Sequence, residues 1–178
     1  MAQGEPRRIG VTVQLRPHAY DPMQDWERFD GVLPRRALAF AIDVAIVIAP
    51  VALAYVMVFL FALLTFGLGW ILHVLLYPGA IVWILLYYGT TLGAPASATI
   101  GMRLMEIELR TWYGGPCHPV LGAAHAVAFY VSVTTLTPLV LAVAFVNARR
   151  RLLHDLVLGT VVINNGRRAA SLRALRPI

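Results

Sequence analysis

Residues 37–91 read ALAFAIDVAIVIAPVALAYVMVFLFALLTFGLGWILHVLLYPGAIVWILLYYGTT, and this stretch decides the fold. Its only acidic side chain is Asp43 and its only histidine is His73, and it contains no arginine or lysine. A helix that crosses a bilayer needs about 20 apolar residues, so the stretch is long enough for two such helices and a tight turn. The sequence therefore predicts a transmembrane helical hairpin.

The turn of this hairpin is expected at Thr65–Gly69, where two glycines permit backbone angles that other residues resist. The first helix is then predicted over Pro34–Leu64 and the second over Trp70–Tyr88. Pro34 suits the first turn of a helix, because its missing N–H would have no partner there in any case.

The composition agrees with a membrane location. Of the 178 residues, 59% are hydrophobic and 13% are charged, whereas a soluble domain carries about a quarter charged residues. The net charge is +6 and all 15 basic residues are arginines, most of them flanking the apolar stretches, as at cytoplasmic membrane boundaries. A lipid bilayer is therefore the expected partner, and nucleic acid is not. The single Cys117 excludes an internal disulfide and a paired-cysteine metal site.

Residues 93–119 are polar and irregular. Within them, Ile107 and Leu109 alternate with charged neighbours, which predicts a short strand. The segment that follows, Thr111–Pro116, contains two glycines and a proline and is typical of a turn. We expect this region to lie at the membrane surface. The predicted fold is thus an all-α membrane protein with a short surface β-like element.

A third apolar stretch runs from Val120 to Val146 and ends at the basic run 149–151. Its length fits one long tilted helix with a polar middle. It fits equally well two half-length helices folded back at Thr134–Pro138. Re-entrant backbone of the second kind is tolerated in a membrane only where protein covers it.

The arginines favour the second arrangement. Six precede the first span, none lies between the first two spans, and seven follow the third stretch. Both chain ends are therefore expected in the cytoplasm, whereas three full crossings would place them on opposite sides. Residues 1–35 are polar and resemble no signal peptide, so the first span is expected to act as the insertion signal. The expected location is the cytoplasmic (inner) membrane of a bacterium.

Asp43 carries the strongest functional signal in the chain. It lies about two turns inside the first predicted helix, roughly 10 Å along the axis. An aspartate at the centre of a membrane helix costs about 2.5–3.5 kcal/mol, so it is expected to face protein or water and to have a partner. Arg36 precedes it by seven positions on the same helix face. We expect Arg36 to mark the interface, and Asp43 to reach a group from another segment.

The segment Arg149–Asp155 supplies candidates for that group. It contains a second carboxylate, Asp155, and a histidine, His154, beside the arginine run. We predict one charge network in which Asp43 and Asp155 share at least one arginine, either Arg36 or a member of the run. The alternative is that Asp43 only joins helices together, hydrogen-bonded to an arginine and to backbone, with no role in transport.

Three segments resemble the RDD family of membrane proteins, which is named for an arginine and an aspartate in the first helix and a second aspartate near the C-terminus. Residues 35–43 (RRALAFAID) are similar to the family's opening, and residues 97–104 (SATIGMRL) to the stretch after its second helix. Residues 151–162 (RLLHDLVLGTVV) resemble its closing segment. The resemblance covers about Gly31–Ile163 in the right order. It implies a polytopic membrane protein of poorly defined activity, with transport or an accessory role as the expected options.

The chain departs from the family pattern at several positions. Met102 stands where a basic residue is usual, and Glu106 where a small residue is common. His125 lies near the place where an arginine often follows the Gly-Gly-Pro turn. If that arginine normally balances the acidic pair, His125 would make the balance dependent on pH.

These observations lead to two functional hypotheses. The first is transport of an ion or small ligand by way of intramembrane carboxylates, and the second is a non-catalytic accessory or assembly subunit of a larger membrane complex. Three spans are few for a transport pathway, so a homo-oligomer or a larger complex is expected. No residue set points to an enzyme, a cofactor or a metal site. The predicted functional polar cluster consists of Arg36, Asp43, His125, Arg151, His154 and Asp155.

The predicted organisation has three parts. A polar cytoplasmic segment occupies residues 1–33, an RDD-like transmembrane domain residues 34–163, and an arginine-rich tail residues 164–178.

Overall fold

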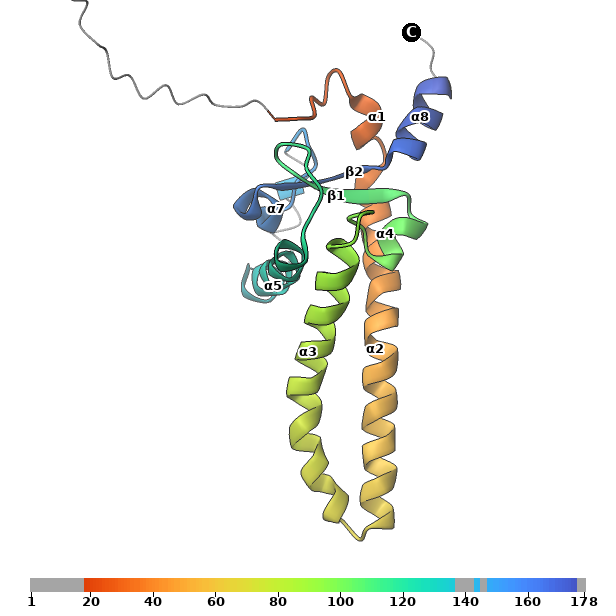
Figure 1. Ribbon diagram of the computed structural model, residues 1–178, viewed down its shortest axis with the longest axis vertical. Helices are drawn as coiled ribbons and strands as arrows, with labels where there is room; N and C mark the ends of the chain where they lie inside the picture. Colours follow the sequence, from red (N-terminus) through yellow and green to blue (C-terminus); the bar gives the residue numbers. More distant parts are fainter. Residues whose placement is uncertain (1–17, 137–142, 145–146, 176–178) are drawn as a thin grey trace, which may run out of the picture.

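Two long antiparallel helices form a hairpin in the computed structural model, which describes residues 18–136, 143–144 and 147–175 (Figure 1). Helix α2 spans Val32–Leu64, and helix α3 spans His73–Leu92 after the short 3-10 helix η1, Leu68–Leu72. At about 1.5 Å per residue, the 33 residues of α2 extend about 50 Å, well beyond the roughly 30 Å apolar core of a bilayer. Part of α2 therefore lies outside that core.

The turn falls where it was predicted, and its two glycines have different tasks. Gly67 adopts a φ of +95°, which side chains disfavour. A Cβ at Gly69 would lie 2.7 Å from the backbone of Ala62, so only glycine permits this close approach. The second helix begins at His73 and not at Trp70, because the chain leaves the turn through η1.

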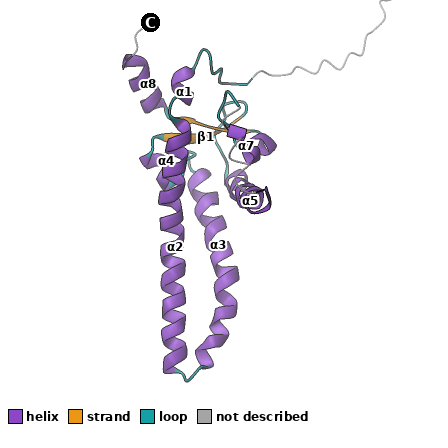
Figure 2. Cartoon of the chain, turned by 180° about the vertical axis from the view of Figure 1, so that it is seen from behind, coloured by secondary structure: helices purple, strands orange, loops and turns teal. Residues whose placement is uncertain are grey.

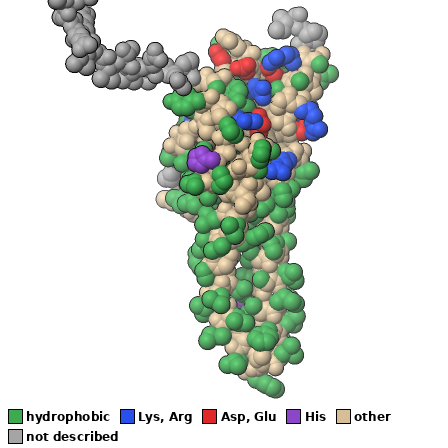
Figure 3. Space-filling model, in the orientation of Figure 1, with side chains coloured by type: hydrophobic (Ala, Val, Ile, Leu, Met, Phe, Trp, Pro, Cys, Tyr) green, Lys and Arg blue, Asp and Glu red, His purple; other side chains and the backbone are tan. Residues whose placement is uncertain are grey.

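Both helices expose apolar side chains along most of their length. By length and composition the stretches Trp26–Leu64 and Leu68–Leu92 can each cross a membrane, and only 6% of the most apolar window of each is buried. Hydrophobic side chains cover the hairpin in Figure 3, whereas charged side chains gather at the end opposite the turn. The predicted pair of long apolar helices is confirmed.

The predicted surface strand is present and has a partner that the sequence analysis missed. Strand β1 (Ile107–Thr111) pairs antiparallel with β2 (Thr160–Asn164), with Leu109 opposite Val162. Both of these side chains are buried in a core that also includes Val32 at the start of α2. The sheet therefore connects the first helix, the middle of the chain and its C-terminal part.

Short helices surround this sheet at the open end of the hairpin. They are α1 (Trp26–Phe29), α4 (Ile100–Leu104), α7 (Leu153–Leu158) and α8 (Gly166–Leu175). Helices α1 and α8 contact each other through an ion pair between Glu27 and Arg173, and both lie far from the turn in the two opposite views of Figures 1 and 2. Helices α1 and α8 therefore lie together at the open end of the hairpin, and the side of the membrane on which the chain ends lie stays a prediction.

The described part of the third apolar stretch is helix α5, Pro119–Leu136. Figures 1 and 2 both show it nearly end-on while the hairpin runs vertically, so α5 crosses the hairpin and does not run alongside it. It packs on the last turns of α3, where a Cβ at Gly122 would lie 2.8 Å from the Leu92 Cβ. The predicted fold-back at Thr134–Pro138 extends outside the described residues and stays a prediction, as do the bounds of the three predicted parts of the chain.

The topology is testable by cysteine labelling in intact cells. Phe66 at the tip of the turn is fully exposed, and Phe66→Cys should react with a membrane-impermeant maleimide added outside. The native thiol of Cys117 should not react with the maleimide, because Cys117 is 4% exposed and burial raises its pKa to about 11. Arg167→Cys on α8 serves as the control and should react only after the cells are lysed. The reverse pattern of labelling would overturn the proposed orientation.

Candidate functional site

A cavity of about 420 Å³ lies at the open end of the hairpin, between the first turns of α2, helix α5 and the start of α7. Most of its wall is aliphatic or aromatic, with Phe40 of α2 facing Phe129 of α5 at a ring-centroid distance of 5.1 Å. The charged and hydrogen-bonding residues on its wall include Arg36, Asp43, Thr99, His125 and His154. These polar residues come from four segments that are separate in the sequence and that meet around one space.

Asp155, directly beside the cavity, is fully buried and ion-paired. Its Oδ2 accepts a hydrogen bond from Arg36 Nη1 at 2.6 Å and another from the Leu152 backbone N–H at 2.9 Å. The second contact places the carboxylate over the first turn of α7, where negative charge is favoured. Burial alone would raise the pKa of Asp155, but Arg36 and two neighbouring histidines hold it well below its usual range.

Arg151 fixes the backbone around this carboxylate. Its guanidinium donates to the carbonyl oxygens of Thr160 and Asp155, both at 2.7 Å, and lies 4.8 Å from the ring centroid of Trp112. Because Thr160 opens β2, this arginine links the start of α7 to the sheet. Arg151 therefore positions Asp155 through the main chain and forms no ion pair with its carboxylate in the described structure.

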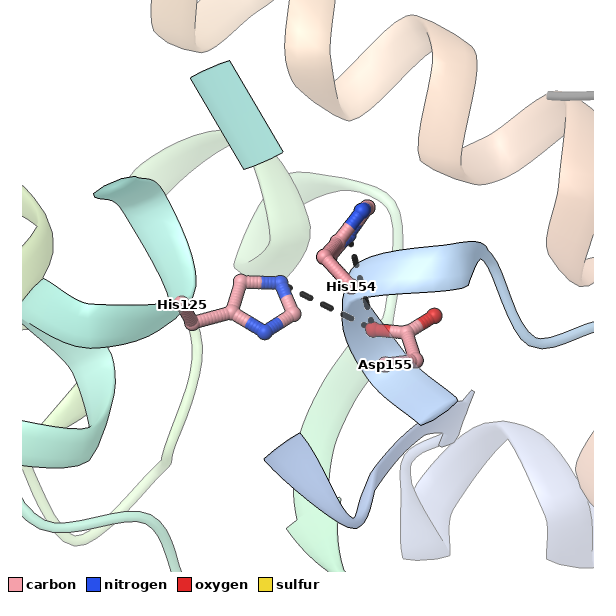
Figure 4. A group of neighbouring side chains, drawn as sticks. All are labelled: His125, His154 and Asp155. Carbon is pink, nitrogen blue, oxygen red and sulfur yellow. Dashed lines mark ion pairs between the residues drawn. The ribbon is translucent and has the colours of Figure 1, made fainter. Parts of the chain in front are cut away.

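Two histidines approach Asp155 from different helices, as Figure 4 shows. The Nε2 atoms of His125 on α5 and His154 on α7 lie 3.8 Å and 3.6 Å from Asp155 Oδ1. Burial lowers the pKa of His125 to about 4 and that of His154 to about 3, with Asp155 opposing both shifts and Arg36 adding to them. Both imidazoles are therefore neutral at pH 7. A change in the charge of His125 is therefore expected only at acidic pH.

Several nitrogen atoms of these rings are buried without a partner. Among the described residues, His125 Nδ1 and both ring nitrogens of His154 have no hydrogen-bond partner. Buried polar atoms are normally satisfied, so such a group is a sign of an unfilled interaction. Within the same part of the chain, one donor atom each from His125, His154 and Asp155 lie within 4.8 Å of one another, a set that can hold a metal ion.

Asp43 has partners of its own, and they are neutral. Its carboxylate accepts hydrogen bonds from the Tyr87 hydroxyl at 2.6 Å, the Thr99 hydroxyl at 2.6 Å and the Gly101 backbone N–H at 2.8 Å. The expected ion pair with Arg36 or the run 149–151 is absent from the ion pairs of the described residues. Three neutral donors satisfy the oxygen atoms of this buried side chain, so no arginine is required.

The structure thus divides the predicted cluster. Arg36, His125, His154 and Asp155 come together, with Arg151 behind them, while Asp43 faces the same cavity from a separate hydrogen-bonded site. Arg149 lies apart and donates to the carbonyl oxygen of Tyr20 at 3.3 Å.

Sequence reasoning missed the partners of Asp43. One signal for them was present: Thr99 precedes the short helix α4 and caps it by accepting from the Met102 N–H. Gly101 in that helix packs so tightly on α2 that a Cβ would lie 2.2 Å from the Ala39 carbonyl oxygen. Tyr87 gave no signal, since an aromatic residue near a helix end is expected at an interface anyway.

A search of protein-family models identifies the RDD family over residues 31–159. This match spans more than half of the chain and contains Arg36, Asp43 and Asp155. No curated protein and no solved structure matches the chain.

Proposed function

Because this chain belongs to the RDD family of membrane proteins, we propose that it binds a small amphipathic ligand in the cavity at the open end of its hairpin and takes part in transporting that ligand. The observation that carries the proposal is the cavity itself. Sites for small molecules are typically about 300–1,000 Å³, mostly apolar, with a few placed polar groups. The cavity of about 420 Å³ meets this description.

The polar groups around the cavity favour a ligand with a neutral head. Asp155 is already paired with Arg36, and Asp43 is already saturated by hydroxyl and amide donors. The imidazoles of His125 and His154 are the groups that keep unmet hydrogen-bonding capacity. A hydroxyl or carbonyl head satisfies them without separating an ion pair, while the apolar body of the ligand contacts the cavity wall.

The same contacts weigh against cation exchange at the two carboxylates. A cation at Asp43 would have to displace the hydrogen bonds from Tyr87, Thr99 and Gly101, and one at Asp155 Oδ2 would have to displace Arg36. Breaking a buried ion pair of that kind costs about 3–5 kcal/mol. We therefore assign Asp43 and the Oδ2 atom of Asp155 to the frame of the site, and we propose that the protein is not an enzyme.

Transport by this chain would require further subunits. The hairpin offers two long helices in the described residues, and two helices cannot enclose a path across a bilayer. We propose a homo-oligomer in the bacterial inner membrane, with both chain ends in the cytoplasm. The arginine-rich open end of the hairpin supports this orientation.

The second candidate function is an accessory subunit of a larger membrane complex. The exposed apolar faces of α2 and α3 support it, because each is as suited to partner helices as to lipid. Mass measurement of the native complex in mild detergent separates the two functions. A homo-oligomer favours ligand transport, whereas a stable hetero-complex of defined stoichiometry favours the accessory role.

Photo-crosslinking tests the ligand proposal. The probe is hexadecanol with a diazirine on its chain, added to membrane vesicles that contain the full-length protein. We expect cross-links on α5 near Phe129, and unlabelled hexadecanol should suppress them better than palmitate, whose head is charged. Ala37→Phe places a ring at the cavity wall and should reduce the cross-linking about tenfold, which corresponds to about 1.4 kcal/mol of binding.

The matched control is Ala41→Phe, one turn further along α2, at an exposed alanine that is not on the cavity wall. This variant should cross-link like the native protein. Equal labelling of the two variants, or labels spread along the lipid-facing hairpin, would refute the cavity as the binding site.

A further inference from the structure

We propose that His125, His154 and Asp155 form a binding site for a divalent transition-metal ion of the Zn²⁺ type. The proposal rests on side-chain geometry alone and holds whether or not the cavity takes an amphipathic ligand. It adds a metal centre to a chain in which the sequence indicated none.

The spacing of the three donor groups fits a small tetrahedral ion. Bonds of about 2.0–2.1 Å to nitrogen and oxygen place tetrahedral ligands roughly 3.3 Å apart. The observed separations from Asp155 Oδ1 are 3.6 Å to His154 Nε2 and 3.8 Å to His125 Nε2. All three donors lie within 4.8 Å of one another, so small rotations of the two rings bring them to bonding distance. In Figure 4 the dashed lines from the two histidines end on the same carboxylate oxygen.

The atoms facing this point have free lone pairs. On Asp155 the Arg36 and Leu152 contacts use Oδ2, and Oδ1 keeps only a long contact of 3.5 Å from the Thr160 hydroxyl. His154 is 2% exposed, and its Nε2 has no hydrogen-bond partner in the described structure although it points at Oδ1. An unpartnered, deeply buried imidazole aimed at an ionised carboxylate is the second, independent sign of a bound ion.

The donor set selects the class of metal. Two imidazoles and one carboxylate suit Zn²⁺, Co²⁺ or Ni²⁺, whereas Mg²⁺ and Ca²⁺ prefer all-oxygen sites. Arg36 occupies the far oxygen of Asp155 and keeps that carboxylate ionised, as outer partners of metal-binding carboxylates do. Its positive charge also opposes the ion, so we expect binding weaker than in a structural zinc site.

A metal at this point would have an open coordination position. His125 and His154 both line the cavity, so the fourth ligand would come from that side as water or a ligand oxygen. Sites with three protein ligands and one exchangeable position are those in which zinc binds small molecules.

The test is a titration of the full-length protein in detergent with Co²⁺, followed by displacement with Zn²⁺. The protein is purified through a tag without histidine and stripped with a chelator. We expect one Co²⁺ per chain, with the intense visible absorption of tetrahedral Co²⁺, which Zn²⁺ abolishes. Absence of stoichiometric binding, or only the weak spectrum of hydrated Co²⁺, overturns the proposal without recourse to any variant.

Variants then locate the ion. His125→Gln and His154→Gln should each weaken Co²⁺ binding by at least about tenfold, because even outer partners of a metal site contribute about 10–100-fold. His73→Gln is the matched control, since His73 stacks on Trp70 at 4.5 Å near the turn at the other end of the hairpin. Size-exclusion profiles and circular dichroism establish that each variant is folded. Native-like affinity in both cluster variants, or an equal loss in the control, overturns the assignment.

Discussion

Asp155→Ala is expected to lower the free energy of unfolding by about 3–5 kcal/mol, the usual cost of removing one partner of a buried ion pair. The reason is that Arg36, with a side chain 13% exposed, keeps its charge but loses the carboxylate at 2.6 Å. The start of α7 also loses the contact to the Leu152 N–H. For a chain of this size the melting temperature in detergent should fall by roughly 6–20 °C.

The double variant Arg36→Met with Asp155→Leu distinguishes the cost of losing the ion pair from the cost of leaving one buried charge without a partner. It should recover about half of the lost stability, because apolar residues of similar volume replace a buried pair at little cost. Glu106→Gln is the control for an exposed pair. Glu106 lies 3.0 Å from Arg167, whose side chain is 80% exposed, and 3.8 Å from Arg35, whose side chain is 25% exposed. Loss of the Glu106 charge should change stability by about 0–1 kcal/mol. A double variant as unstable as the sum of its single variants would contradict the assigned pairing.

Gly101→Ala is expected to be nearly as damaging, although it adds a single methyl group. The new Cβ would lie 2.2 Å from the Ala39 carbonyl oxygen and 2.9 Å from Asp43 Cγ. Helix α4 must then move away from α2, and the 2.8 Å hydrogen bond from the Gly101 N–H to Asp43 is lost. Overpacking costs about 1–3 kcal/mol and a hydrogen bond to a charged group contributes about 1.5–3 kcal/mol, so we expect a loss of about 3 kcal/mol or more.

Gly79→Ala provides the matched control for this measurement. Gly79 lies within α3 and a Cβ there meets nothing within 4 Å, so the same substitution should change stability by no more than about 1 kcal/mol. Melting curves of both variants in one detergent make the comparison. A Gly101→Ala protein as stable as the Gly79→Ala protein would show that α4 does not pack on α2 as described.

The hairpin could be predicted because the length and the apolar composition of residues 37–91 can be read without knowing any contact between distant segments. Asp43 is the one acidic residue of an otherwise apolar stretch. The glycines at 67 and 69 mark the short turn that divides this stretch into two helices. The strand at Ile107 was predictable for the same reason, since its alternation lies within five residues. Its partner was not, although Thr160–Asn164 carries a β-branched run, because strand pairing depends on which distant segments meet.

The partners of the residues in the candidate site could be predicted only in part from the sequence. Intramembrane carboxylates need partners, and that rule predicted a partner for Asp43. It does not say whether the partner is a charge, a hydroxyl or a backbone N–H, so Asp43 was expected to meet an arginine and instead meets Tyr87, Thr99 and Gly101. The approach of His125 to Asp155 depends on how α5 crosses α3, which no local pattern encodes.

The pairing of Arg36 with Asp155 has a consequence for the order in which the protein is made. The two residues are 119 positions apart, and chains grow at about 5–20 residues per second, so the arginine waits roughly 6–24 s for its partner. During that interval the nascent first helix carries an unneutralised guanidinium, which must stay at the lipid headgroups and so holds the helix at its final depth. Ribosomes that stall before the codon for Asp155 would release chains whose hairpin is inserted but whose cavity is unfinished, and such chains are natural targets for membrane proteases.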